Sequence, residues 1–131
     1  MKLLLDTNVL LWALSNSPRL KQDVKDIILN SNIGTTADEV IISDISLMEI
    51  SIKVNIGKLE QSMDELFDSI KQLGYRRLAI SDSALRELTL LPLLHRDPFD
   101  RMIVAQAKVE KATLITGDEI LAKYGIKSII I

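Results

Sequence analysis

The chain has 131 residues, 47% of them hydrophobic and 26% charged, and its formal net charge is −2 at pH 7. This size and composition are typical of one folded domain with one continuous core, so we assign residues 1–131 to a single domain. The absence of cysteine excludes disulfides, thiolate zinc sites and cysteine nucleophiles, and a single histidine excludes a mechanism that needs two imidazoles. The slight negative charge argues against a nucleic-acid binder that works through a basic surface.

Membrane insertion is not expected from the sequence. No uninterrupted apolar run approaches the roughly 20 residues that a membrane span needs. Asp6 interrupts the N-terminal apolar stretch too early for a secretory signal. We therefore expect a cytoplasmic protein with no membrane contact.

Short apolar runs alternate along the chain with segments of helical periodicity. Continuous Leu, Ile and Val runs are typical of strands that are buried on both faces. In chain order they predict strands at residues 2–5, 40–43, 78–80, 113–116 and 128–131. The other segments predict helices at residues 8–14, 20–29, 46–56, 62–74, 81–91, 98–111 and 118–124.

Local sequence signals mark several helix boundaries. Ser62 and Glu65 form a capping box at the start of the fourth helix, and Asp97 with Pro98 begins the sixth. Strands that alternate with helices predict a parallel sheet with right-handed crossovers. We therefore predict an α/β fold of three layers, α/β/α, around a five-stranded, mainly parallel sheet. The loop at residues 33–39 is expected to be flexible.

Four acids stand at the end of an apolar run or on an apolar helix, namely Asp6, Glu49, Asp100 and Asp118. Carboxylates are costly in such places unless a positive group compensates them. Asp6 and Asp118 follow predicted parallel strands, whose carboxyl ends meet at one edge of the sheet. A hard divalent cation is the simplest compensating group. If the four carboxylates converge, they predict a metal-dependent enzyme that cleaves phosphodiesters.

Each of the three aspartates also has a purely structural interpretation. Asp6 and Asp118 could cap the helices that follow them, and Asp100 could complete a capping box with Asp97. Glu49 has no such explanation, because its spacing puts it on the helix face of Ile45, Ile52 and Ile56, which we expect to be buried.

Four segments, taken together, carry a resemblance to a known family: LLDTNVLLW (4–12), SLMEISIK (46–53) followed by GKL (57–59), HRDPFDRMIVAQA (95–107) and LITGD (114–118). In their order and chemistry they resemble the PIN domain family, and within it the VapC-like toxin ribonucleases of toxin–antitoxin pairs. The family's four acids fall on Asp6, Glu49, Asp100 and Asp118.

The resemblance implies an endoribonuclease that uses one or two Mg²⁺ or Mn²⁺ ions and metal-activated water, with the four acids as catalytic metal ligands. It further implies an RNA substrate, a cognate antitoxin protein and a homodimer. Asn8, Asp97 and Thr116 match supporting polar positions. Basic side chains near the proposed ligands could hold RNA phosphates: Lys53, Lys58, Arg96 and Arg101.

One departure concerns the HRDPFD segment. Close relatives often carry a second histidine where this chain has Leu94, which leaves the role of His95 open. The few aromatic side chains do not favour extensive base stacking, and we expect Trp12, on the apolar first helix, in the core.

Two other functional classes stay open at this point. A receiver-like phosphoacceptor domain has a similar length and also holds Mg²⁺ with acids at strand ends, but it would require adjacent acids after the first strand, where Asp6 is followed by Thr7. A catalytically idle PIN fold that only binds a partner would be expected to lack one or more of the four acids. All four are present in this chain.

Overall fold

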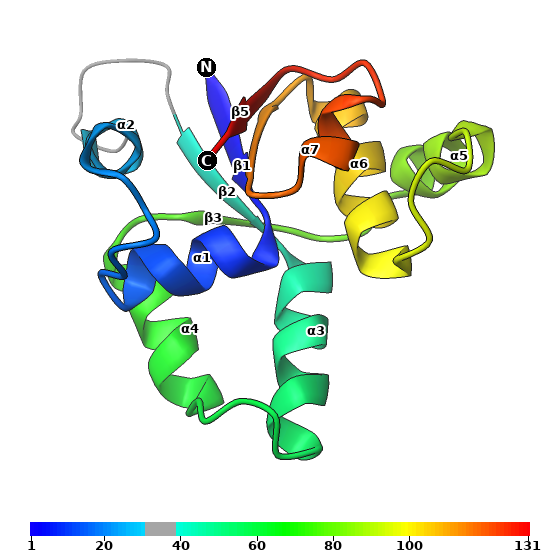
Figure 1. Ribbon diagram of the computed structural model, residues 1–131. Helices are drawn as coiled ribbons and strands as arrows, with labels where there is room; N and C mark the ends of the chain where they lie inside the picture. The colour runs from blue at the N-terminus through cyan, green and yellow to red at the C-terminus, as the bar shows by residue number, and fades with distance from the viewer. Residues whose placement is uncertain (31–38) are drawn as a thin grey trace.

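The computed structural model describes residues 1–30 and 39–131. Its centre is a five-stranded sheet in the order β3-β2-β1-β4-β5, in which every neighbouring pair is parallel (Figure 1). The strands are β1 (Lys2–Leu5), β2 (Glu39–Ser43), β3 (Arg76–Leu78), β4 (Thr113–Thr116) and β5 (Ser128–Ile130). The predicted loop at residues 33–39 lies, except for Glu39, outside the described residues.

Seven helices are found in the described residues: α1 (Thr7–Leu14), α2 (Gln22–Asn30), α3 (Asp44–Asn55), α4 (Met63–Gln72), α5 (Asp82–Leu90), α6 (Pro98–Glu110) and α7 (Glu119–Ala122). The predicted caps of α4 and α6 are present, since Ser62 Oγ accepts from the Glu65 amide and Asp97 Oδ1 from the Phe99 amide. Within this part of the chain, none of the helices has the length and apolarity that crossing a bilayer requires.

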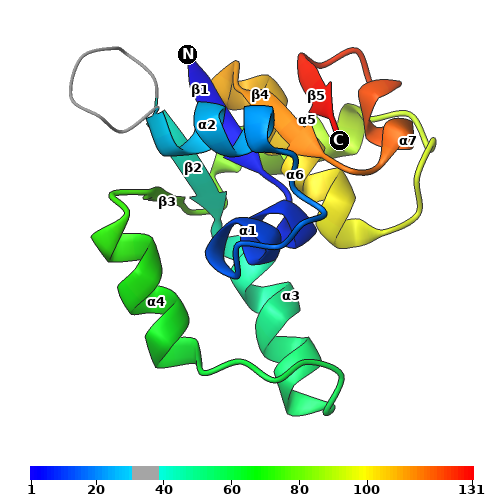
Figure 2. The ribbon, with the colours of Figure 1, turned by 60° about the vertical axis from the view of Figure 1, so that its left-hand side comes forward.

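Helices cover both faces of the sheet, which confirms the predicted three-layer α/β/α fold (Figures 1 and 2). Successive strand residues point to opposite faces. Leu3 and Leu5 of β1 therefore belong to a core with α1, α2, α3 and α4, while Leu4 belongs to a second core with α5, α6 and α7. All three leucines are fully buried, as expected for the central strand of a covered sheet.

The third strand lies two residues earlier than predicted. Arg76, Arg77 and Leu78 pair with Ile41, Ile42 and Ser43, whereas Ile80 lies beyond the pairing and is exposed. Because β3 is an edge strand, the two arginines can reach carboxylates near the sheet surface, Glu39 and Glu110 for Arg76 and Asp44 for Arg77. Apolar periodicity locates buried strands better than such an edge strand.

The chain reverses its direction of winding at β1. From β1 the sheet grows first to β2 and β3, and later, on the other side, to β4 and β5. A crevice forms at such a reversal, outside the carboxyl ends of the strands. The residues directly after β1 and β4 therefore face the same crevice, and these residues are Asp6 and the segment 117–118.

Candidate active site

A cleft of about 680 Å³ opens at this edge of the sheet. Four parts of the chain contribute its acidic side chains, which are Asp6, Glu49, Asp97, Asp100, Asp118 and Glu119. Two cationic side chains, Arg19 and Lys53, also line it. The structure thus brings the four predicted acids Asp6, Glu49, Asp100 and Asp118 to one place, in a cleft whose formal charge is −4, from six acids and two bases.

Asp6 is buried at the end of β1 and serves two local purposes. Its Oδ1 accepts from the Val9 amide at 2.8 Å, which caps α1, and its Oδ2 accepts a hydrogen bond from the Thr116 hydroxyl at the end of β4. Burial raises the pKa of Asp6 above its usual value, and the hydrogen bonds from Thr116 and Val9 oppose that rise. The Asp6 carboxylate therefore caps α1 and lines the cleft at the same time.

Glu49 reaches the cleft from α3 and is held from two sides. The Thr7 hydroxyl donates to its Oε1 at 2.7 Å, and Lys53 Nζ, one helical turn further on, lies 3.2 Å from its Oε2. The predicted reason for its burial is wrong, however. Ile52 and Ile56 are exposed, and the buried side of α3 carries Ser46, Leu47 and Ile50 instead.

Asp100 lies in the first turn of α6, behind the Asp97 cap, whose Oδ1 accepts from the amides of Phe99 and Asp100. Burial raises the pKa of Asp100 from 3.8 to about 7. The carboxylates of Asp97, Glu49 and Asp6 add to this rise, and His95 opposes it. Near neutral pH, Asp100 is therefore only partly ionised, because it is buried and faces other carboxylates.

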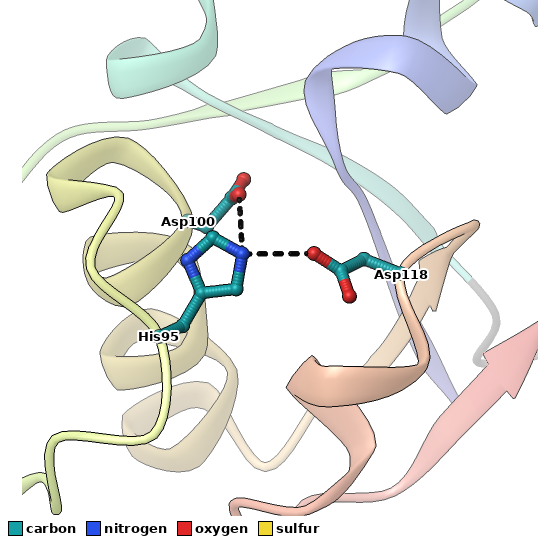
Figure 3. A group of neighbouring side chains, drawn as sticks. All are labelled: His95, Asp100 and Asp118. Carbon is teal, nitrogen blue, oxygen red and sulfur yellow. Dashed lines mark hydrogen bonds and ion pairs between the residues drawn. The ribbon is translucent and has the colours of Figure 1, made fainter.

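Asp118 caps α7 through Oδ1, which accepts from the Ile120 amide at 2.9 Å. Its Oδ2 lies 2.9 Å from Nε2 of His95, and the same nitrogen is 3.6 Å from Oδ2 of Asp100 (Figure 3). The other ring nitrogen, Nδ1, accepts from the Asp97 amide at 3.0 Å. The proton of the neutral ring is therefore on Nε2, and His95 acts as a hydrogen-bond donor toward the acids.

The three predicted supporting residues are also near the cleft. Asn8 lines it with an exposed side chain, and Asp97 lines it while capping α6. Thr116 is buried and joins two acids, since its hydroxyl donates to Asp6 and accepts from the Asp118 amide at 3.0 Å.

The predicted phosphate-binding residues are distributed differently. Lys53 lines the acidic cleft, whereas Arg96 and Arg101 line a separate depression. The Arg101 guanidinium donates to the Pro92 carbonyl at 2.9 Å and to the Tyr124 hydroxyl at 3.2 Å, and thereby fixes the segment before α6. Contacts of these two arginines with RNA remain a prediction from the sequence.

Sequence reasoning did not identify Thr7, Trp12 or Arg19 as residues of the cleft. Thr7 directly follows the first acid and could have been found from that position. Trp12 packs against the core as expected, but it also lines the cleft. Arg19 has no local signal, since it reaches the cleft only through the turn after α1.

The donor set of the cleft fits a hard divalent cation. Asp6, Glu49, Asp100 and Asp118 offer only carboxylate oxygens, which Mg²⁺ and Mn²⁺ prefer. Carboxylate oxygens of Asp100 and Asp118 lie within 4.8 Å of each other and of a ring nitrogen of His95, which in the tautomer described above donates to the acids and is not a ligand. Burial raises the pKa of Asp100, and the carboxylates of Asp97, Glu49 and Asp6 add to the rise, so a cation in the cleft would favour its ionised form.

Fold and site together define an α/β protein with a carboxylate cleft at the switch point of its sheet. The sequence matches the model of the PIN domain family over residues 3–127, and the chain belongs to that family. This confirms the family expected from the motifs. The receiver alternative is overturned, because receiver sheets have the order 2-1-3-4-5 and this sheet does not.

Solved structures share the fold. VapBC2 from Rickettsia felis, bound to a promoter DNA fragment, matches with a TM-score of 0.76 and 18% identity over 99% of this chain and 98% of that chain. VapBC-1 from nontypeable Haemophilus influenzae matches with a TM-score of 0.67 and 19% identity over 99% of this chain and 98% of that chain. A toxin–antitoxin complex from Klebsiella pneumoniae matches with a TM-score of 0.55 and 19% identity over 88% of this chain and 85% of that chain. No curated protein sequence matches the chain significantly.

Proposed function

We propose that this chain is a metal-dependent endoribonuclease and the toxin of a toxin–antitoxin pair. The observation that carries the proposal is the convergence of the carboxylates of Asp6, Glu49, Asp100 and Asp118 on one cleft, in which acidic side chains outnumber cationic ones by six to two. An enzyme that acts on a polyanion would not gain from such a cleft unless cations bind there first. Members of the PIN family are generally nucleases, which agrees with this chemistry.

Asp6, Glu49, Asp100 and Asp118 would hold one or two Mg²⁺ or Mn²⁺ ions. When bound, such ions supply an activated water nucleophile and stabilise the charge that develops on the phosphate. The residues of the chain prepare this site. Thr116 and the Val9 amide hold the Asp6 carboxylate in place, and Thr7 does so for Glu49.

Two other groups change state when cations and substrate enter. Asp100 loses its proton when a cation binds, because ligation requires the ionised carboxylate. Lys53 pairs with Glu49, and it would be free to contact a substrate phosphate if a bound cation neutralised that acid. An internal ion pair of the cleft would then be exchanged for a contact with RNA.

RNA cleavage by the purified protein, with and without a chelator, tests the catalytic proposal. We expect cleavage with Mg²⁺ or Mn²⁺, none with chelator, and a loss of at least about a hundredfold in Asp6→Asn and Asp100→Asn. Asp82→Asn is the matched control, since Asp82 is an exposed acid in the first turn of α5. Activity that survives chelation, or survives both site substitutions in folded protein, contradicts the proposal. A folded protein that binds RNA without cutting it would instead support the idle binding module.

The toxin role requires an antitoxin that covers part of the surface. Met48 and Ile52 of α3 and Ile56, the residue directly after it, recur at every fourth position and form an exposed apolar stripe, with Met48 54% and Ile56 56% exposed. An amphipathic antitoxin segment that buries this stripe would lie next to Lys53 and Glu49, at the mouth of the cleft. The similar VapBC and toxin–antitoxin structures support a partner of this kind.

We propose a different surface for the homodimer. Leu90, at the end of α5, is 74% exposed, and Leu93, just beyond it, is 76% exposed. Two leucines that are so exposed near each other in sequence favour burial against a second copy of the chain. Because these residues lie away from the α3 stripe in the sequence and on the other face of the sheet, dimer formation and antitoxin binding would be compatible (Figure 1).

A further inference from the structure

Trp12 and Arg19 form a cation–aromatic pair on the wall of the acidic cleft. The guanidinium carbon of Arg19 lies 5.9 Å from the centre of the Trp12 ring, and both side chains line the cleft together with the acids. The separation is near the roughly 6 Å limit of a cation–π contact. The contact is therefore at the long end of the cation–π range, and the exposed Arg19 guanidinium is not enclosed by it.

The chain builds this pair with a turn directly after α1. Asn16 has a positive φ of 52°, and the Ser17 amide donates to the Trp12 carbonyl at 2.9 Å. The Ser17 hydroxyl in turn accepts from the Arg19 amide at 3.2 Å. These bonds reverse the chain, so that Arg19, seven positions after Trp12, comes back over its ring.

The Trp12 side chain packs against the core and remains partly exposed. Its ring packs against the main core, and on the cleft side it passes over Gly117, next to Asp118. A Cβ at Gly117 would lie 3.5 Å from Cη2 of the indole, which is ordinary van der Waals distance, so the backbone at Gly117 lies close to the ring. The indole thus stands directly beside one of the proposed metal ligands.

Arg19 is the cation of the cleft that is available for a phosphate. Lys53, on α3, is paired with Glu49 at 3.2 Å, whereas no carboxylate of the described residues is within ion-pair distance of Arg19, whose side chain is exposed. The planar guanidinium of Arg19 can donate two parallel N–H hydrogen bonds to two oxygens of one phosphate. An RNA strand that enters this negatively charged cleft would therefore bind through its phosphates at Arg19.

We propose that Trp12 and Arg19 form a nucleotide-binding subsite for single-stranded RNA beside the catalytic acids, with Arg19 on a backbone phosphate and the Trp12 ring against the adjoining base. The inference rests on the proposed ribonuclease function for the identity of the ligand. An indole next to an arginine is the combination that binds single strands without sequence preference. Bases in an A-form duplex are stacked inside it and cannot reach a ring in a cleft.

Trp12 is the single tryptophan of the chain, so its fluorescence reports on this subsite alone. The experiment mixes the protein and Mg²⁺ with single-stranded oligoadenylate in a stopped-flow instrument, which reads binding before any cleavage. We expect saturable quenching by oligoadenylate and far weaker quenching by the oligoadenylate–oligouridylate duplex. Anisotropy of a labelled oligoadenylate measures total binding in parallel.

Variants separate the subsite from general charge effects. Arg19→Ala should weaken oligoadenylate binding roughly tenfold and lower the salt dependence by about one phosphate contact. Arg77→Ala is the matched control, because Arg77 lies over the Phe67 ring at 5.4 Å on another part of the surface and should leave binding unchanged. Trp12→Phe, which retains core packing, should weaken binding in the anisotropy measurement.

Each outcome bears on the proposal. RNA that binds without a change in Trp12 fluorescence, equal affinity for duplex, equal affinities of Arg19→Ala and Arg77→Ala, or no binding at all would overturn the subsite. Cleavage that proceeds in the first three cases leaves the ribonuclease function intact. RNA that quenches the Trp12 fluorescence but is not cleaved would overturn the ribonuclease function and leave the subsite in place.

Discussion

Nε2 of His95 donates a hydrogen bond to Oδ2 of Asp118 across 2.9 Å, while Nδ1 of the same ring is engaged by the Asp97 amide. The imidazole therefore joins the segment before α6 to the segment after β4. It offers a proton to the acids, and in this tautomer Nε2 has no lone pair for a metal. Oδ1 of Asp118 is held by the Ile120 amide independently of the histidine.

His95→Ala removes this donor from the acidic cleft. We expect the metal-free protein to lose about 1–2 kcal/mol of its free energy of unfolding, and we expect saturating Mg²⁺ to raise the melting temperature more in the variant than in the wild type. The reason is that Mg²⁺ and His95 compensate the same carboxylates. Thermal unfolding with and without Mg²⁺ measures both effects. His95→Gln, which retains an N–H donor, should resemble the wild type, and identical Mg²⁺ shifts in all three proteins would contradict the argument.

Asp100 makes the stability of the metal-free protein depend on pH. Its pKa is about 7 in the folded state and near 3.8 in the unfolded chain, so between these values the folded state binds more protons. The free energy of unfolding must then fall as the pH rises through this window. Between pH 5 and pH 8 the loss from this group is on the order of 3 kcal/mol.

Urea unfolding at both pH values, in wild type and Asp100→Asn, measures this contribution. The difference between the two proteins isolates the contribution of Asp100 from that of all other groups. A wild type that loses no more stability than Asp100→Asn between pH 5 and pH 8 would show that Asp100 titrates normally.

The same proton weakens cation binding at low pH. A cation requires the ionised form of Asp100, and a pKa of about 7 leaves a minority of molecules in that form at pH 6. We expect the apparent Mg²⁺ affinity to be about tenfold lower at pH 6 than at pH 8. Calorimetric titration at the two pH values tests this, and proton release on binding near pH 7 should accompany it. An affinity that does not change with pH would exclude Asp100 as an ionised ligand.

Thr116→Val removes the hydroxyl that joins Asp6 to the Asp118 amide without changing the shape of the side chain. A buried carboxylate and an amide each lose a partner, which should cost about 1–3 kcal/mol of the free energy of unfolding. The pKa of Asp6 should rise further, because the Thr116 bond lowers it, and Mg²⁺ affinity at neutral pH should fall. Thr113→Val, at the other end of β4, is the control that should change neither the pKa of Asp6 nor the Mg²⁺ affinity.

The two apolar surfaces can be separated by introducing a charge into each. Leu93→Glu should convert a dimer into a monomer in light scattering and leave antitoxin binding intact. Met48→Glu should leave the dimer intact and weaken antitoxin binding. Each variant is the control for the other, and a loss of both properties in either one would refute the assignment of separate surfaces.

The sequence alone was sufficient for the features that depend on near neighbours. Strand and helix order, the Ser62 and Asp97 caps and the family motifs follow from periodicity and short spacings, and the structure agrees with them. That Asp6 and Asp118 meet at one edge followed from one further rule, that the carboxyl ends of parallel strands share an edge, whereas the approach of Glu49 and Asp100 from their helices was expected from the family motifs. The structural alternatives for Asp6 and Asp118 were correct as well, since each caps a helix while lining the cleft.

Tertiary packing decided the rest. Which face of α3 is buried depends on its neighbours α1 and α6, so Glu49 enters the cleft beside exposed Ile52. The turn at Asn16 brings Arg19 to the cleft, and carbonyl groups hold Arg101 elsewhere. A side chain's direction and partners are determined by contacts between distant segments, and such contacts leave no periodic trace in the sequence, whereas caps and strands are formed by residues a few positions apart.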